Sequence, residues 1–160
     1  VLNKMPAPMQ VGPAYLLERA KAELATGKSA NAIETLLAAV AKAPDDWENY
    51  STLGIAYDMN DEFARARNAY DRAKQLSANN PAVLNNLAIS MALSGDLEGA
   101  IRTLEDAPMV ARHSAQMRQN LALFYGIKGD VAKAESLARI DLDDKTVRQN
   151  LEVYSKLRRN

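Results

Sequence analysis

Apolar residues recur along most of the chain at intervals of three and four, which is the spacing of an amphipathic helix. Between Ser51 and Ala73, for example, Leu53 and Tyr57 mark one apolar face, and Tyr70 belongs to a second face that follows a polar break. Similar breaks, "TGKS", "NDE", "SGD" and "KGD", occur at regular distances along the sequence. The pattern therefore predicts pairs of short helices joined by tight turns.

The whole pattern repeats every 34 residues. Small residues keep this step in two columns, Ala20, Gly54, Ala88 and Ala122, and Ala32, Ala66, Ala100 and Ala134. A helix–turn–helix unit of 34 residues is typical of tetratricopeptide repeats. We therefore expect an all-α, right-handed tetratricopeptide solenoid. Its four units lie at about 13–46, 47–80, 81–114 and 115–148.

Gly54 lies inside a predicted helix, where a glycine costs about 1 kcal/mol relative to alanine. The repeat offers a reason, because the two helices of a unit cross closely at small residues. We expect Gly54 to lie against Ala66, so that the two backbones can approach each other.

The ends of the predicted helices carry recognisable signals. Asp96 and Asp130 stand where an acidic N-cap would begin the second helices of units three and four. Pro108 should end the second helix of unit three early, with a connection through about Ser114, and the second helix of unit four should end near Ile140.

The two termini of the sequence have different patterns. Residues 1–12 lack periodicity and contain two prolines, which indicates an extended leader or linker. At the other end, a helix over about 144–157 is expected to cap the solenoid and to complete a single domain over 13–160. Its apolar face consists of Val147, Leu151, Tyr154 and Leu157.

Composition argues against several classes of function. The 20 basic residues balance the 20 acidic ones, so nucleic acid is not expected as a partner. The chain has no cysteine and one histidine, His113, which cannot form a metal site or a catalytic triad without further partners. No phosphate-binding glycine loop occurs. We expect a protein that is not an enzyme and that binds no metal or cofactor.

Two stretches carry a closer resemblance. "PAVLNNLAISMALSGDLEGAIRTLEDA" and the later "RQNLALFYGIKGDVAKAESLARIDL" resemble the TadD-type lipoproteins of the tight-adherence (Flp) pilus. In that family an "NNLA…ALSG" unit also precedes a proline-interrupted segment, "RQNLAL" and a short terminal helix. The resemblance covers about residues 47–157.

The resemblance implies a periplasmic protein tethered to the outer membrane by an N-terminal lipid. It also implies a role in assembling the Flp pilus secretion apparatus, with a pilus or secretin component as partner. Contact with the membrane would be through the anchor alone, and the anchor would lie outside this sequence, which has no cysteine.

The first helices of a tetratricopeptide array line its concave side, where a partner segment could bind. Apolar residues recur there from unit two onward, and amides accompany them in units three and four. The predicted peptide-binding groove consists of Ile55, Met59, Asn85, Asn86, Ile89, Leu93, Gln119, Asn120, Leu123 and Ile127.

Several alternatives remain open at the level of sequence. Neighbouring helices could bury the apolar residues of the predicted groove, or the groove could be open to an amphipathic helix or an extended apolar peptide. The protein could be a general tetratricopeptide adaptor or co-chaperone, with the cytoplasm as the alternative location, or a regulatory domain of an enzyme. The places that hold basic residues in domains that clamp a terminal carboxylate are here Leu17, Ser51, Ala82 and Gln116, with Asn86 alone matching the clamp.

Overall fold

The computed structural model describes residues 11–109 and 114–158, and within these ranges the regular elements are helices. Most of the expected leader, and His113, lie outside the described residues. The first helices of the four units are α1 (Pro13–Ala25), α3 (Trp47–Asp58), α5 (Pro81–Leu93) and α8 (Ala115–Lys128). The second helices are α2 (Ser29–Lys42), α4 (Phe63–Leu76), α6 (Leu97–Glu105) and α9 (Val131–Ala138). Helix α10 (Asp144–Leu157) follows the last unit.

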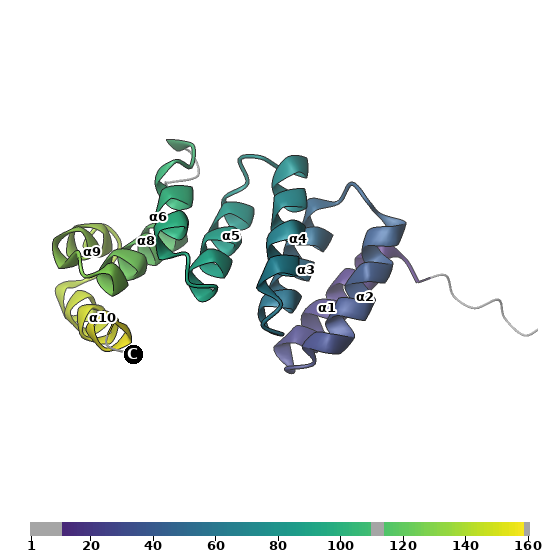
Figure 1. Ribbon diagram of the computed structural model, residues 1–160, viewed down its shortest axis with the longest axis horizontal. Helices are drawn as coiled ribbons and strands as arrows, with labels where there is room; N and C mark the ends of the chain where they lie inside the picture. The colour runs from purple at the N-terminus through teal and green to yellow at the C-terminus, as the bar shows by residue number, and fades with distance from the viewer. Residues whose placement is uncertain (1–10, 110–113, 159–160) are drawn as a thin grey trace, which may run out of the picture.

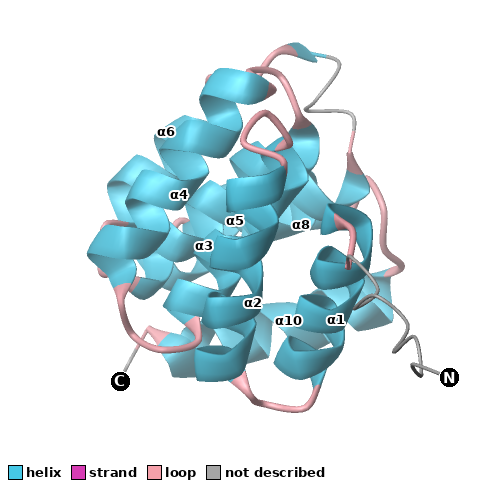
Figure 2. Ribbon diagram, turned by 90° about the vertical axis from the view of Figure 1, so that its right-hand side faces the viewer, coloured by secondary structure: helices cyan, strands magenta, loops and turns pink. Residues whose placement is uncertain are grey.

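The helices form an extended array in chain order, with α1 and α2 at one end and α10 at the other (Figure 1). Within each unit the first helix packs on the second, and the second packs on the first helix of the next unit. Seen end-on, the units lie one behind another (Figure 2). First helices also contact one another, as α3 does α5 and α5 does α8, which makes one face of the array from α1, α3, α5 and α8.

Side chains at the turns fix where several helices begin. Asp96 accepts a hydrogen bond from the backbone N–H of Gly99, and Asp130 accepts one from that of Lys133, at 2.9 and 3.2 Å. Both acidic N-caps expected from the sequence are therefore confirmed. They satisfy backbone donors that a helix cannot pair internally.

The small residues of the repeat are completely buried where the helices of a unit cross. At Gly54, the three atoms nearest to a Cβ built on the glycine all belong to the ring of Tyr70 on α4. A Cβ atom placed on Gly54 would lie 2.6 Å from Cε1 and Cζ of the Tyr70 ring. The close approach expected at Gly54 is present, and the Tyr70 ring is the group nearest to the glycine.

The last two units depart from the regular pattern as the sequence suggested. Helix α6 ends at Glu105, before Pro108, and α9 ends at Ala138. Asp141 stands 34 residues after Ala107, where Ala39 and Ala73 keep the same step. It accepts hydrogen bonds from Nε and Nη2 of Arg118 on α8 at 2.9 and 2.5 Å. This bidentate pair fastens the chain after α9 to α8.

Helix α10 covers the apolar end of the array, as predicted. Val147 is fully buried with Ala122 and Ala138. The Tyr154 ring lies so close to Gly126 of α8 that a Cβ there would meet Tyr154 Cδ2 at 2.4 Å. Leu157, expected on the same face, is exposed.

Replacing Gly54 with alanine should destabilise the protein by about 1–3 kcal/mol, although alanine is the better helix former by about 1 kcal/mol. The new methyl group would overlap the buried Tyr70 ring. Urea unfolding followed by circular dichroism measures the change. The control is Gly54→Ala combined with Tyr70→Leu, which reproduces the pair Ala88 and Leu104 of unit three. If Gly54→Ala is as destabilising in the Tyr70→Leu background as alone, the contact with the ring is not the cause.

Deleting residues 144–160 should lower the melting temperature and cause self-association, because it uncovers Ala122, Ala138 and Gly126. Calorimetry and sedimentation velocity measure the two effects. A truncated protein that stayed monomeric and melted at the parent temperature would show that α10 does not act as a cap.

Candidate functional site

The first helices of units two and three enclose an apolar hollow of about 310 Å³. Seven residues line it: Ile55, Asp58, Met59, Tyr70, Asn86, Ile89 and Leu93. Five of them belong to the ten predicted groove residues, whose positions follow from the 34-residue period. We call this hollow the α3–α5 groove.

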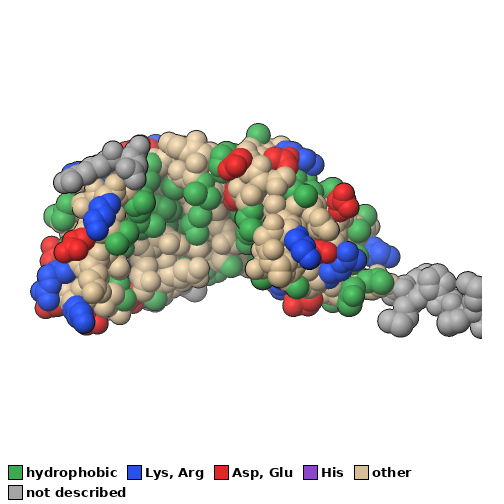
Figure 3. All heavy atoms as spheres, turned by 90° about the horizontal axis from the view of Figure 1, so that it is seen from below, with side chains coloured by type: hydrophobic (Ala, Val, Ile, Leu, Met, Phe, Trp, Pro, Cys, Tyr) green, Lys and Arg blue, Asp and Glu red, His purple; other side chains and the backbone are tan. Residues whose placement is uncertain are grey.

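The apolar residues of the groove differ in how far they reach solvent. Ile55 and Ile89 are half-buried and pack against the core, whereas 49% of Met59 and 60% of Leu93 is exposed. Exposed large apolar side chains that cluster around a hollow are typical of binding surfaces. In Figure 3 the array is an arch on which hydrophobic side chains gather over the middle, and most basic ones lie toward the ends.

Asp58 and Tyr70 line the groove but were not among the predicted residues. The Asp58 carboxylate accepts hydrogen bonds from Tyr70 Oη on α4 at 2.9 Å and from Ser90 Oγ on α5 at 2.7 Å. Burial raises the pKa of Asp58 above its ordinary value, and the two hydrogen bonds oppose that rise. The inward place of Asp58 in the repeat could have identified it, but its two partners could not be read from the sequence.

The amides predicted to bind a peptide backbone are largely paired with the protein itself. Asn85 is 2% exposed, and its Oδ1 accepts from Nδ2 of Asn120 at 2.7 Å. Asn86 Nδ2 donates to Ser51 Oγ at 3.3 Å. Asn85 and Asn120 therefore join α5 to α8, and Asn86 joins α5 to α3. Asn85 is too buried to contact a partner in this conformation.

The remaining predicted residues lie on α8, beyond the α3–α5 groove. They are Gln119, Asn120, Leu123 and Ile127, all half-buried. Leu123 packs against the core as Ile55 and Ile89 do. None of the four lines the hollow between α3 and α5. The structure thus brings together the part of the predicted groove that belongs to units two and three.

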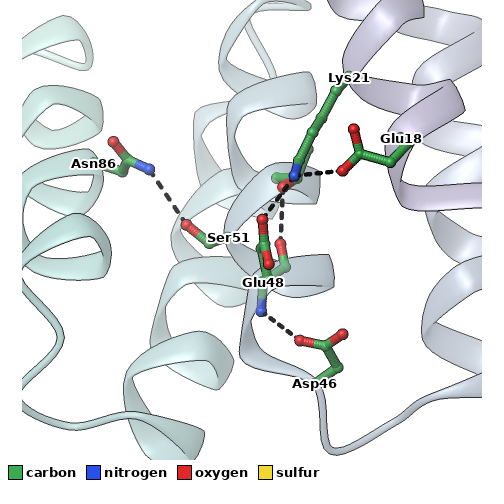
Figure 4. Close-up of polar contacts among 7 residues, drawn as sticks. Glu18, Lys21, Asp46, Glu48, Ser51 and Asn86 are labelled. Atoms are coloured by element: carbon green, nitrogen blue, oxygen red, sulfur yellow. Dashed lines mark hydrogen bonds and ion pairs between the residues drawn. The ribbon is translucent and has the colours of Figure 1, made fainter. Parts of the chain in front are cut away.

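A polar cluster joins unit one to unit two. Lys21 of α1 forms ion pairs with Glu18 at 2.9 Å and with Glu48 of α3 at 2.7 Å (Figure 4). The hydrogen bonds to both carboxylates raise the pKa of Lys21. At the repeat position of Ile55 and Ile89, unit one therefore has a lysine that is occupied in holding α1 to α3.

Other kinds of site have little support in the described part of the chain. No group of three or more metal-ligating side chains comes together within residues 11–109 and 114–158. None of the helices described there is long and apolar enough to cross a membrane.

Comparison with known proteins gives matches of two kinds. A family model of the tetratricopeptide repeat matches residues 59–123. A protein of Thermus thermophilus, TTC0263, superposes with a TM-score of 0.76 at 20% identity, over 89% of this chain and 80% of that one. Both the sequence match and the superposition concern the helical pairs. The chain has the tetratricopeptide repeat fold.

Two further solved structures are similar, the second of them a tetratricopeptide domain. PilF of Pseudomonas aeruginosa gives a TM-score of 0.74 at 18% identity, over 92% of this chain and 75% of that one. The first such domain of Spaghetti (RPAP3), bound to an HSP90 peptide, gives 0.66 at 16% identity, over 73% and 95% of the two chains. At these identities the likeness shows the fold alone. Curated protein sequences give no match.

The tetratricopeptide fold implies a scaffold for protein–protein interaction. It is typically non-catalytic, because its surfaces present side chains for recognition on a stack of regular helices.

The raised pKa of Asp58 predicts how the stability of the array depends on pH. A folded-state pKa above the unfolded value means that the folded state holds this proton more tightly. The contribution of Asp58 to stability is therefore lost as the pH rises from the ordinary aspartate pKa through the raised one. The difference in unfolding free energy between Asp58→Asn and the parent should shift in favour of the variant over this interval. Urea titrations at several pH values measure it, and a constant difference would contradict the assignment.

Proposed function

We propose that this tetratricopeptide protein is a non-catalytic scaffold that binds one amphipathic helix of a protein partner in the α3–α5 groove. We further propose that it acts in assembling a bacterial Flp (tight-adherence) pilus secretion apparatus. The observation that carries the first part is the apolar hollow of about 310 Å³ at whose edge Met59 and Leu93 are exposed.

The chemistry of the groove favours an apolar ligand surface. Ile55, Met59, Ile89 and Leu93 supply two apolar pairs from neighbouring helices. The carboxylate of Asp58, the charged group among the lining residues, already accepts hydrogen bonds with both oxygens. Burying apolar side chains here is worth about 25 cal/mol for each Å² removed from water. A partner would therefore gain most by inserting leucine-like side chains.

A helical partner fits this groove better than an extended one. An extended segment leaves its backbone N–H and C=O groups to be paired by the binding surface. The amides that could pair them are largely engaged, Asn85 with Asn120 and Asn86 with Ser51. A helix satisfies its own backbone, presents apolar side chains along one face, and needs few polar partners.

The pilus role rests on the resemblance of residues 47–157 to the TadD-type lipoproteins. The superposition with PilF gives the pilus role weak support, because the name of that protein refers to a pilus. On this proposal the protein works in the periplasm, tethered to the outer membrane by a lipid attached upstream, and a secretin or pilus component supplies the helix.

The second candidate is a general adaptor or co-chaperone, and one observation favours it. A similar tetratricopeptide domain, that of Spaghetti (RPAP3), is bound to an HSP90 peptide. A carboxylate clamp of the kind described above is poorly matched here, since Leu17, Ser51, Ala82 and Gln116 carry no positive charge. We therefore place the pilus scaffold first.

The test is co-purification and calorimetric binding with the secretin and assembly proteins of an Flp pilus system. Leu93→Asp should weaken binding at least about tenfold, because a carboxylate would enter the apolar contact. The folded state should persist, since Leu93 is 60% exposed in the free protein. Circular dichroism checks that the helices remain.

Leu37→Asp is the matched control, because Leu37 is an exposed apolar residue on α2 outside the groove. Binding that Leu93→Asp and Leu37→Asp weaken equally would place the partner elsewhere. Groove-dependent binding of a protein unrelated to pili would support the scaffold and contradict the pilus role.

A further inference from the structure

A second and larger hollow, of about 410 Å³, lies among α4, α5 and α6. Its apolar lining includes Leu84 and Met91 of α5 and Ala107 after α6. Leu84 and Met91 are about 140–180° around α5 from Ile89 and Leu93 when each residue turns by about 100°. The hollow therefore lies on the opposite side of α5 from the α3–α5 groove. We call it the unit-three hollow.

Two residues that line the hollow differ in kind from those at the same repeat positions of units two and four. In unit two, Arg65 lies over the Tyr57 ring at 4.2 Å from the centroid and donates to Tyr57 Oη at 2.7 Å. In unit four, Lys133 lies over the Tyr125 ring at 4.5 Å. Met91 stands at the corresponding aromatic position of unit three.

Unit three also lacks a basic residue at the repeat position of Arg65 and Lys133. It holds Gly99, which has no side chain to cover the hollow. Gly99 is buried against the Met91 side chain, and a Cβ there would meet Met91 Cε at 2.4 Å. The cation–aromatic pair of units two and four is therefore missing from unit three. The corresponding hollow of unit two, which Tyr57 and Arg65 line, is smaller, at about 260 Å³.

Two cations line the hollow without a partner. Within the described part of the chain, neither the side chain of Lys74 on α4 nor that of Arg102 on α6 has a hydrogen bond or ion pair. The other basic side chains of α4 are paired, Arg65 with Glu62, Arg67 with Asp71 and Arg72 with Asp45. Asp106 is the one carboxylate among the lining residues, so positive charge prevails.

From this arrangement we infer that the unit-three hollow binds an acidic segment of a protein partner. A glutamate or aspartate of the segment pairs with Arg102 and Lys74, and an adjacent apolar side chain packs on Leu84, Met91 and Ala107. A guanidinium binds a carboxylate through two parallel hydrogen bonds. The rim residues Asn79 and Pro108 are exposed, so the hollow is open enough for a peptide chain to cross it.

Helix dipoles give an alternative reason for the two cations. Lys74 and Arg102 stand in the last turns of α4 and α6, where positive charge stabilises a helix. That role requires no ligand, and it does not require the two cations to line one hollow. The experiment must therefore measure binding and not stability alone.

The probe is a fluorescein-labelled peptide, Gly-Glu-Leu-Glu-Gly, titrated with the protein and followed by fluorescence anisotropy. We expect saturable binding that weakens as salt is added, because both cations are exposed. The double variant Lys74→Gln/Arg102→Gln should bind at least about tenfold more weakly. Both side chains are on the surface, and circular dichroism verifies that the variant folds.

Arg67→Gln is the matched control, since Arg67 lies on α4 outside the hollow and pairs with Asp71 at 3.4 Å. It should leave the affinity for the peptide unchanged. The proposal is overturned if the parent protein does not bind Gly-Glu-Leu-Glu-Gly, or if the double variant binds it as well as the parent. Equal weakening by Arg67→Gln would show general charge attraction. Equal binding of Gly-Gln-Leu-Gln-Gly or Gly-Glu-Gly-Glu-Gly would also overturn it, because the hollow would then not recognise both carboxylate and apolar groups.

Discussion

The architecture depends on how closely the two helices of a unit can approach. At the crossings the side chains are small and completely buried, for example at Ala20, Ala88 and Ala122. A larger side chain at these places would push the helices apart and displace the large residues beside them. Because each unit packs only on its neighbours, the geometry of one crossing sets where the next unit begins. At Gly54 the limit is reached, since even a methyl group would overlap the Tyr70 ring.

The same crossing shapes the proposed binding groove. Gly54 lets Tyr70 reach across α3, and the hydroxyl of that ring meets Asp58 at the floor of the groove. Asp58 also accepts from Ser90, so one carboxylate joins α3, α4 and α5. The exposed side chains of Met59 and Leu93 are thus held on a floor that is fixed by hydrogen bonds. A rigid apolar surface loses little conformational entropy when a partner binds.

Much of this fold could be predicted from the sequence, because a 34-residue period determines which positions meet in space. The first helices begin at Pro13, Trp47, Pro81 and Ala115, which are the unit starts that the period gives. Asp96 and Asp130 were identified as caps because capping depends on local sequence.

The polar partners could not be predicted in the same way. Asn85 of unit three and Asn120 of unit four are 35 residues apart and are hydrogen-bonded to each other. The period places both amides on the same face, but it does not say that they pair with each other. The pair of Arg118 and Asp141 is a similar case. Asp141 stands where the repeat has alanine, and its partner Arg118 lies on α8. Side-chain geometry decides such pairs, and a repeat pattern does not encode it.

The hydrogen bonds and ion pairs that join neighbouring units differ from one joint to the next. The joint between units two and three is tied by Ser90 to Asp58 and by Asn86 to Ser51, in partly buried surroundings. The joint between units one and two is tied by the partly buried ion pair of Lys21 with Glu48 and by the exposed hydrogen bond of Ser29 to Asn60. The first joint therefore has an ion pair where the second has hydrogen bonds. Because dissolved salt screens ion pairs near the surface, added salt weakens the polar tie of the first joint more than those of the second.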